Sequence, residues 1–204
     1  MHTCQKQDQR KKATATYKKH HVQFYFKILL CKLCLFILTV HQQKLSSVLF
    51  GNMNIHWYCK AFNALLPVEL YKIMQLRNEV FVVEQNCVFQ DADNKDEGCL
   101  HFMGFAGNEL AAYTRLVPPG YIYDEMSIGR VATSAKHRSK GLGRELMQRS
   151  IELCRQCFGD WSIKIGAQFY LLRFYSSFGF KIIGERYLED GIEHIHMLLG
   201  NSDN

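Results

Sequence analysis

Long uninterrupted apolar segments are missing from this 204-residue sequence. The most apolar stretch, Phe24–Val40, contains Lys27 and Lys32, and a central lysine costs about 2.5–3.5 kcal/mol in a membrane helix. Its second part, Leu33–Val40, follows a basic flank as a signal sequence does, but no small-x-small cleavage site comes after it. The alternatives for residues 1–52 are a weak membrane or targeting segment, a loose appendage, and sequence that precedes the true start. Because Met53 begins a stretch with the pattern of a folded domain, we favour the last two together.

Acidic residues are scarce in the first quarter of the chain. Residues 1–52 hold nine Lys and Arg against one Asp, a net charge of +8, so the total of +6 leaves −2 for residues 53–204. The basic balance therefore belongs to the tail, which we expect to be disordered over residues 1–23. A body with a slightly negative net charge gives no electrostatic support to nucleic-acid binding.

The cysteine spacing of a zinc site is also missing. Cys31-x-x-Cys34 and Cys154-x-x-Cys157 look like half sites, but they are far apart in the chain. The first pair lies in an apolar run, and the second lies on the apolar side of a predicted helix. We interpret these cysteines as small apolar residues of a reduced intracellular protein, and we expect no metal site.

The acidic segment Gln90–Gly98 lacks the pattern of a calcium loop. Lys95 stands where an oxygen ligand is needed, and Asp96 stands where the turn requires glycine. We therefore expect a solvated acidic loop.

The most informative feature present is a strand, a glycine-containing turn and an amphipathic helix in succession. Ser127–Thr133 has strand character, and the helix after the turn has an apolar face at helical spacing. That face comprises Leu142, Leu146, Ser150, Leu153 and Cys157, flanked by Met147, Ile151 and Cys154. The first amides of a helix have no intrahelical partner, and Gly141 and Gly143 have no Cβ. The pattern favours an anion site at the helix start, framed by positive side chains.

Two common phosphate loops do not fit this turn. A nucleoside-triphosphate loop requires Gly-Lys-Ser/Thr at the helix start, whereas Gly143 is followed by Arg144 and Glu145. A Rossmann loop requires a third glycine and an acidic residue one strand later, and neither is present.

The remaining periodicity predicts an α/β fold with a mixed, mostly antiparallel sheet and helices on both faces. Strands are predicted at 54–60, 100–106, 109–117, 127–133, 163–168, 180–187 and 192–199, and helices at 68–84, 142–157 and 170–178. The strand at 163–168 follows the central helix and is predicted to be of the parallel type. The segment 81–85 has strand propensity, so the pattern does not fix the residue at which the first helix ends.

Two motifs carry a resemblance to a known family. Arg138-x-x-Gly141-x-Gly143 resembles the pyrophosphate-binding motif of the GNAT N-acetyltransferase superfamily, and residues 174–180, Phe-Tyr-Ser-Ser-Phe-Gly-Phe, resemble its Phe-Tyr-x-x-x-Gly-Phe signature. Residues 77–87, 128–131, 166–168 and 189–195 are similar to the ElaA-like branch. The resemblance covers about residues 53–199. It implies the GNAT acyl-CoA N-acyltransferase fold, with a single domain at 53–204 and a non-family extension at 1–52.

The resemblance implies acetyl-CoA as the acyl donor. Its pyrophosphate would be held by backbone N–H groups of Arg138, Ser139, Lys140, Gly141, Leu142, Gly143 and Arg144. Its pantetheine arm would lie along Val131, Ala132 and Thr133 as an added strand, with Gln168 as a further contact. Gln168 departs from the wider superfamily, where many members have Asn. A bulge at Gly129 would separate this strand from the next, and an N–H near Val131 would face the developing oxyanion.

The same resemblance assigns Tyr175 as the acid that protonates the leaving thiolate. The base that deprotonates the amine has three candidates: Glu84 is the first, His194 the second and His101 the third. A base acting through a chain of water molecules would leave none of them essential.

We thus expect a cytoplasmic enzyme that moves an acetyl group to a primary amine by direct attack in a ternary complex. A non-catalytic CoA-binding module and a membrane-tethered interaction protein are the alternatives. The acceptor is a small molecule, a peptide N-terminus or a lysine, and Glu84 with the acidic loop suggests a cationic amine. We expect no nucleic acid and, for residues 53–204, no membrane as partner. A homodimer is left open.

Overall fold

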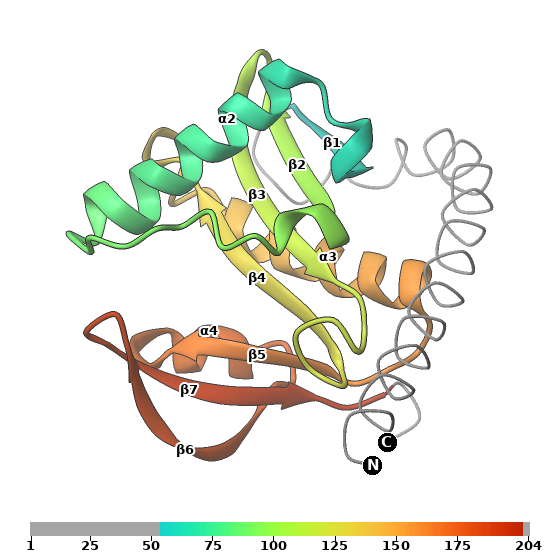
Figure 1. The fold of residues 1–204 in the computed structure, drawn as a ribbon, viewed down its shortest axis with the longest axis vertical. Helices are drawn as coiled ribbons and strands as arrows, with labels where there is room; N and C mark the ends of the chain where they lie inside the picture. The colour runs from blue at the N-terminus through green and yellow to red at the C-terminus, as the bar shows by residue number, and fades with distance from the viewer. Residues whose placement is uncertain (1–53, 202–204) are drawn as a thin grey trace, which may run out of the picture. The chain divides into compact units, whose positions relative to one another are not determined.

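The structure, a computed structural model, describes residues 54–201, which Figure 1 shows as coloured ribbons. The expectations for residues 1–52 lie outside this range. Within it, no helix is both long and apolar enough to cross a membrane.

A seven-stranded sheet forms the centre of the described residues. The strands are β1 (Ile55–Ala61), β2 (Leu100–Ala106), β3 (Glu109–Val117), β4 (Met126–Thr133), β5 (Ile163–Gln168), β6 (Lys181–Glu189) and β7 (Ile192–Leu199). Their order in the sheet is β1-β2-β3-β4-β5-β7-β6, and β4 with β5 is the parallel pair while the other neighbours are antiparallel. The predicted mixed sheet is confirmed, including the parallel strand after the central helix.

Helices cover both faces of this sheet, as predicted. On one face, Ile73 and Leu76 of α2 (Pro67–Arg77) pack against Met103 and Tyr113 of β2 and β3. The next residue of β3, Thr114, points the opposite way and hydrogen-bonds across 2.9 Å to Ser150 of α3 (Leu142–Phe158). Figure 1 shows α3 passing behind β3 and β4.

Two predicted helices are shorter or less regular than expected. The predicted helix at 68–84 is α2 followed by a π-helical segment, Asn78–Glu84. This segment contains three valines and a phenylalanine, whose side chains crowd a regular α-helix. The predicted helix at 170–178 is a 3₁₀ turn, Phe169–Leu171, followed by the single turn of α4 (Leu172–Ser176).

The parallel pair β4 and β5 separates soon after it begins. Met126 pairs with Ile163 and Ser127 with Lys164, and no later residues of the two strands pair. Beyond that point β4 has a bulge, because Arg115 pairs with Gly129 but Tyr113 pairs with Ala132. The bulge predicted at Gly129 therefore lies one position later, at Arg130 and Val131. Arg130 has a left-handed backbone conformation, with φ of 54°.

Candidate active site

A pocket of about 570 Å³ occupies the gap where β4 and β5 separate. Its lining includes Val131 and Thr133 on β4 and Gln168 on β5. Glu84, Tyr175 and His194, the three predicted catalytic residues, also line it. Residues that are widely spaced in the sequence thus meet around one cavity.

The glycine turn lies where β4 leads into α3. Gly141 caps α3 with φ of 78°, and its carbonyl accepts hydrogen bonds from the N–H groups of Arg144 and Glu145. The preceding N–H groups of Leu142 and Gly143 have no intrahelical partner. A Cβ added at Gly143 would meet only a methyl group of Thr133, at 3.9 Å. The fold itself therefore does not need glycine at position 143, whereas a ligand that approaches the backbone closely would.

The Arg138 side chain connects this turn to two residues of the pocket lining, Thr133 and Glu84. Its guanidinium donates to the Thr133 carbonyl, with distances of 3.1 Å from Nε and 2.9 Å from Nη2. It also forms a two-point ion pair with Glu84, with Nη2 at 2.9 Å from Oε2. The hydrogen bond from Arg138 lowers the pKa of Glu84. A carboxylate held in this way is a weak proton acceptor.

Tyr175, on α4, lies deep against the pocket wall, with 7% of its surface exposed. Its ring packs edge-on against Phe174 and Phe180. Burial raises the pKa of Tyr175 to about 12, so its phenol remains protonated at neutral pH. Among residues 54–201 its hydroxyl has no hydrogen-bond partner. The group is therefore available to a ligand in the pocket.

His194 comes from β7, whereas Glu84 ends the π-helical segment. Its Nδ1 lies 2.9 Å from the Ile192 carbonyl, which can only accept a hydrogen bond, so Nδ1 carries the proton in the neutral ring. The other nitrogen, Nε2, then holds the lone pair. The ring stacks on Tyr187, with centroids 5.7 Å apart. In this tautomer the neutral ring can accept a proton at Nε2.

His101, the third candidate base, does not line the pocket. It is fully buried and bonded to the Tyr113 hydroxyl at 2.9 Å and the Asp96 carbonyl at 3.1 Å. Burial lowers the pKa of His101. We interpret it as a structural residue of the core.

Gln168 already uses both ends of its amide within the protein. Its Nε2 donates to Gln85 at 3.0 Å, and its Oε1 accepts from the Tyr170 hydroxyl at 2.6 Å. A cofactor contact at Gln168 would require exchange of one of these partners. In the described residues, no group of three or more His, Cys, Asp or Glu gathers as a metal site would require.

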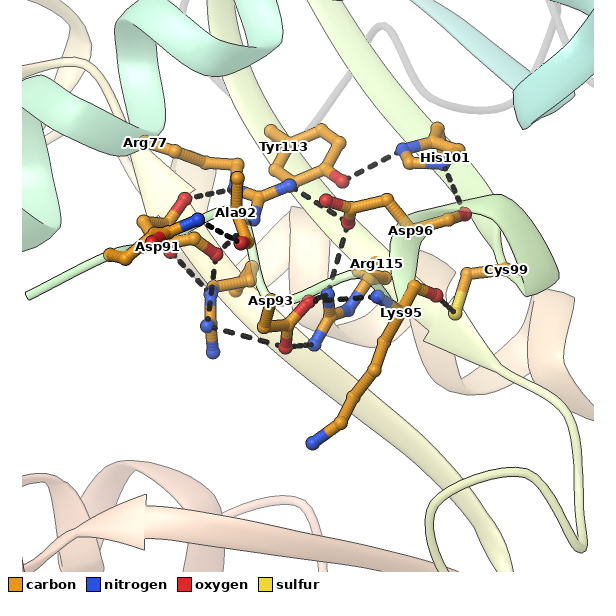
Figure 2. A network of polar contacts seen from close by, with 12 residues as sticks. Arg77, Asp91, Ala92, Asp93, Lys95, Asp96, Cys99, His101, Tyr113 and Arg115 are labelled. Carbon is orange, nitrogen blue, oxygen red and sulfur yellow. Dashed lines mark hydrogen bonds and ion pairs between the residues drawn. The ribbon is translucent and has the colours of Figure 1, made fainter.

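The acidic loop differs from its prediction. Asp91, Asp93 and Asp96 are not solvated but point inward onto three arginines, as Figure 2 shows for most of the group. The arginines are Arg77 at the end of α2, Arg115 on β3 and Arg130 on β4. We call these six residues the arginine–aspartate network.

Close contacts within the network neutralise the loop. Arg115 binds both oxygens of Asp93, at 2.7 and 2.8 Å, and its Nη1 lies 3.0 Å from Asp96. Burial alone would raise the pKa of Asp93, but the hydrogen bonds and charge of Arg115 outweigh it and hold the pKa well below its usual range. The three loop aspartates and Glu84 are thus already paired with arginines. They give no support to the expectation of a cationic acceptor.

The sequence contained a signal for this network that the pattern analysis missed. Arg77 follows the buried Ile73 by one helical turn, and Arg115 lies on a strand whose side chains are nearly all buried. A buried arginine needs a carboxylate partner. The neighbouring acidic segment provides three.

Comparisons with known proteins point to one family. The family model described as "Acetyltransferase (GNAT) domain" matches residues 77–200. A UPF0039 protein of Synechocystis is 39% identical over 147 residues, which cover 72% of this chain and 96% of that protein. Protein ElaA of Escherichia coli is 40% identical over 145 residues, which cover 70% of this chain and 95% of that protein.

A solved structure shows the same fold. The crystal structure of an acyl-CoA N-acyltransferase from Pseudomonas aeruginosa matches with a TM-score of 0.68 and 39% sequence identity. The match covers 71% of this chain and 98% of that one.

Proposed function

Because the chain belongs to the GNAT acetyltransferase family, in its ElaA-like branch, we propose that it transfers the acetyl group of acetyl-CoA to a primary amine. The amine attacks the thioester directly while both substrates are bound. Residues 53–204 form the domain that does this. The observation that supports the proposal most is the separation of β4 from β5, with Tyr175 and Arg138, the first residue of the glycine turn, in the lining of the pocket there.

The cofactor is held mainly by backbone groups. The diphosphate lies at the turn from Arg138 to Arg144, where the free N–H groups of Leu142 and Gly143 and the helix dipole favour negative charge. The pantetheine arm bonds to the unpaired edge of β4 at Val131–Thr133, since β5 has already turned away. The N–H of Val131, which the bulge removes from the pairing with β3, faces the carbonyl oxygen as negative charge develops there.

Tyr175 donates one proton in the reaction and His194 accepts the other. The Tyr175 phenol is protonated and unpaired within the described residues, so it can donate to the leaving thiolate. His194 has its Nε2 lone pair available, so it takes the proton from the attacking amine. We favour His194 over Glu84 as the base because Glu84 is bound to Arg138 at two points.

The test is release of free thiol from acetyl-CoA in the presence of a panel of amines. The panel contains small primary amines, amino-acid esters, and peptides with a free N-terminus or a lysine. We expect amine-dependent thiol release and a matching mass increase of one acetyl group on the accepted amine. CoA binding without turnover on any amine would instead indicate a non-catalytic CoA-binding module.

A further inference from the structure

The backbone conformation of Arg130 needs an explanation. Residues with a Cβ are disfavoured at positive φ, and such strain persists only where the surroundings fix it. Arg130 has φ of 54° and lies in the bulge of β4, next to Val131. Glycine would adopt this conformation without strain. The arginine side chain must therefore provide something that glycine would not.

That side chain is held by a buried carboxylate. Arg130 Nε lies 2.6 Å from Asp91 Oδ1, and the Asp91 side chain is only 1% exposed. The other oxygen of Asp91 accepts from Arg77 at 2.5 Å, and the Arg77 side chain has no exposed surface. Asp91 thus joins Arg130 to the end of α2 through two charge-assisted hydrogen bonds.

Further contacts restrict Arg130 from its other sides. Its guanidinium lies 6.0 Å from the ring centre of Phe81 and 5.9 Å from that of Phe89. Its Nη2 lies 3.5 Å from Asp93, which Arg115 also binds. Figure 2 shows how the loop carboxylates turn toward the buried arginines. The guanidinium is thus fixed within the network, and the backbone that carries it is the bulge.

We propose that Asp91 is a positioning residue for acetyl transfer: by holding the Arg130 side chain, it keeps the bulge of β4 in the conformation that aims the Val131 N–H into the pocket. The inference rests on the proposed function, because it assigns a purpose to the Val131 N–H that only acyl transfer requires. Asp91 itself touches no substrate. Its effect passes through Arg130 to the backbone.

Two substitutions at one position separate this role from its alternatives. Arg130→Ala and Arg130→Gly remove the same side chain contacts, but only glycine accepts the left-handed backbone easily. We expect turnover of R130A to be about tenfold below that of R130G, with the KM for acetyl-CoA within about twofold in both. Asn94→Ala and Asn94→Gly are the matched control, because Asn94 also has positive φ, of 59°, and is exposed outside the pocket. That pair should not differ in turnover.

Asp91→Asn tests the same contact by changing the carboxylate that holds the Arg130 side chain. An amide offers one oxygen where the carboxylate offers two, so one arginine loses its side-chain acceptor on residue 91 and keeps only the backbone carbonyl there. We expect lower turnover per folded molecule, and we expect the D91N change to cost less in the R130G background than in the unaltered protein. Equal effects in both backgrounds would show that Asp91 acts without Arg130 and would overturn the proposal.

The outcomes distinguish this inference from the proposed function. If R130A and R130G lose activity equally through a raised KM for the amine, the guanidinium contacts the acceptor and the positioning role is wrong. If the unaltered protein turns over no amine, the proposed function fails. In that case thermal unfolding still tests the conformational part, because R130G should melt above R130A. The same melting temperature for both would refute it.

Discussion

Replacement of Gly143 should change stability and cofactor affinity in opposite directions. A Cβ at this position meets only the Thr133 methyl group, at 3.9 Å, so the Cβ of alanine or aspartate fits without moving any neighbouring atom. Glycine in a helix is less stable than alanine by about 0.5–1 kcal/mol. A carboxylate in the first turn of a helix gains about 0.3–1 kcal/mol from the helix dipole. Both G143A and G143D should therefore unfold at a temperature equal to or above that of the unaltered chain.

Cofactor affinity should fall in the same variants. At a separation of about 6 Å and an effective dielectric constant of about 20–40, the new carboxylate repels one unit of charge on the nearer phosphate by about 1.5–3 kcal/mol, and the screened, more distant phosphate adds little. G143D should thus bind CoA roughly 10- to 100-fold more weakly. G143A adds bulk without charge and should show a smaller loss.

Isothermal titration with CoA measures the affinity, and thermal unfolding measures the stability. Gln148→Glu, on the exposed side of α3, adds the same charge further along the helix and should alter the affinity less than about twofold. The loss in G143D should shrink as salt is raised, because screening weakens the repulsion. Unchanged CoA affinity in G143D, with the protein folded, would refute the assignment of the turn.

Three further predictions concern catalysis and pH. Tyr175→Phe should lower kcat about 100-fold while CoA affinity stays the same, and unchanged turnover in a steady-state assay would mean that water protonates the thiolate. His194→Gln should reduce kcat more than Glu84→Gln, because Glu84 is paired with Arg138; the reverse ranking would make Glu84 the base. The network holds the pKa of Asp93 below its unfolded value, so its stabilisation is present above about pH 4 and is lost as the pH falls through the folded pKa. Denaturant unfolding of D93N should accordingly show a shallower loss of stability below about pH 4, and an unchanged slope would contradict this account.

The helices and strands could be predicted from the spacing of apolar residues in the sequence, because each element buries one face. The apolar face of α3 was predicted from its spacing, and the structure buries Leu142, Leu146 and Ser150 of that face, whereas Leu153 and Cys157 near the end of the helix are half-buried. The parallel pairing of β5 followed from its position after a crossover helix. The π-helical end of α2 could not be predicted, because valines and phenylalanine have mixed preferences and packing decides between their conformations.

Only part of the site could be predicted from the sequence, for a different physical reason. Tyr175 and the glycine turn belong to contiguous motifs, and the structure places Tyr175 in the pocket. The arginine–aspartate network joins residues up to 53 positions apart, from Arg77 to Arg130, and no local pattern reports such a pairing. The charges of Asp91, Asp93 and Asp96 suggested solvation, although buried arginines elsewhere in the chain bind them.

The position of the bulge shows the same limit. Gly129 was the natural candidate because glycine tolerates unusual backbone conformations. The structure assigns the left-handed conformation to Arg130, whose side chain contacts Asp91. Tertiary contacts therefore override the local preference at this residue.

A comparison of CoA with pantetheine tests the central claim most directly. Pantetheine has the arm that would lie along β4 but lacks the diphosphate that the turn at Gly141 and Gly143 would hold. Titration of the full chain should show one CoA site, with CoA bound at least 100-fold more tightly than pantetheine, since the turn provides about 3 kcal/mol or more of charge-assisted hydrogen bonding. Equal affinity for the two compounds, or no binding of either, would contradict the account.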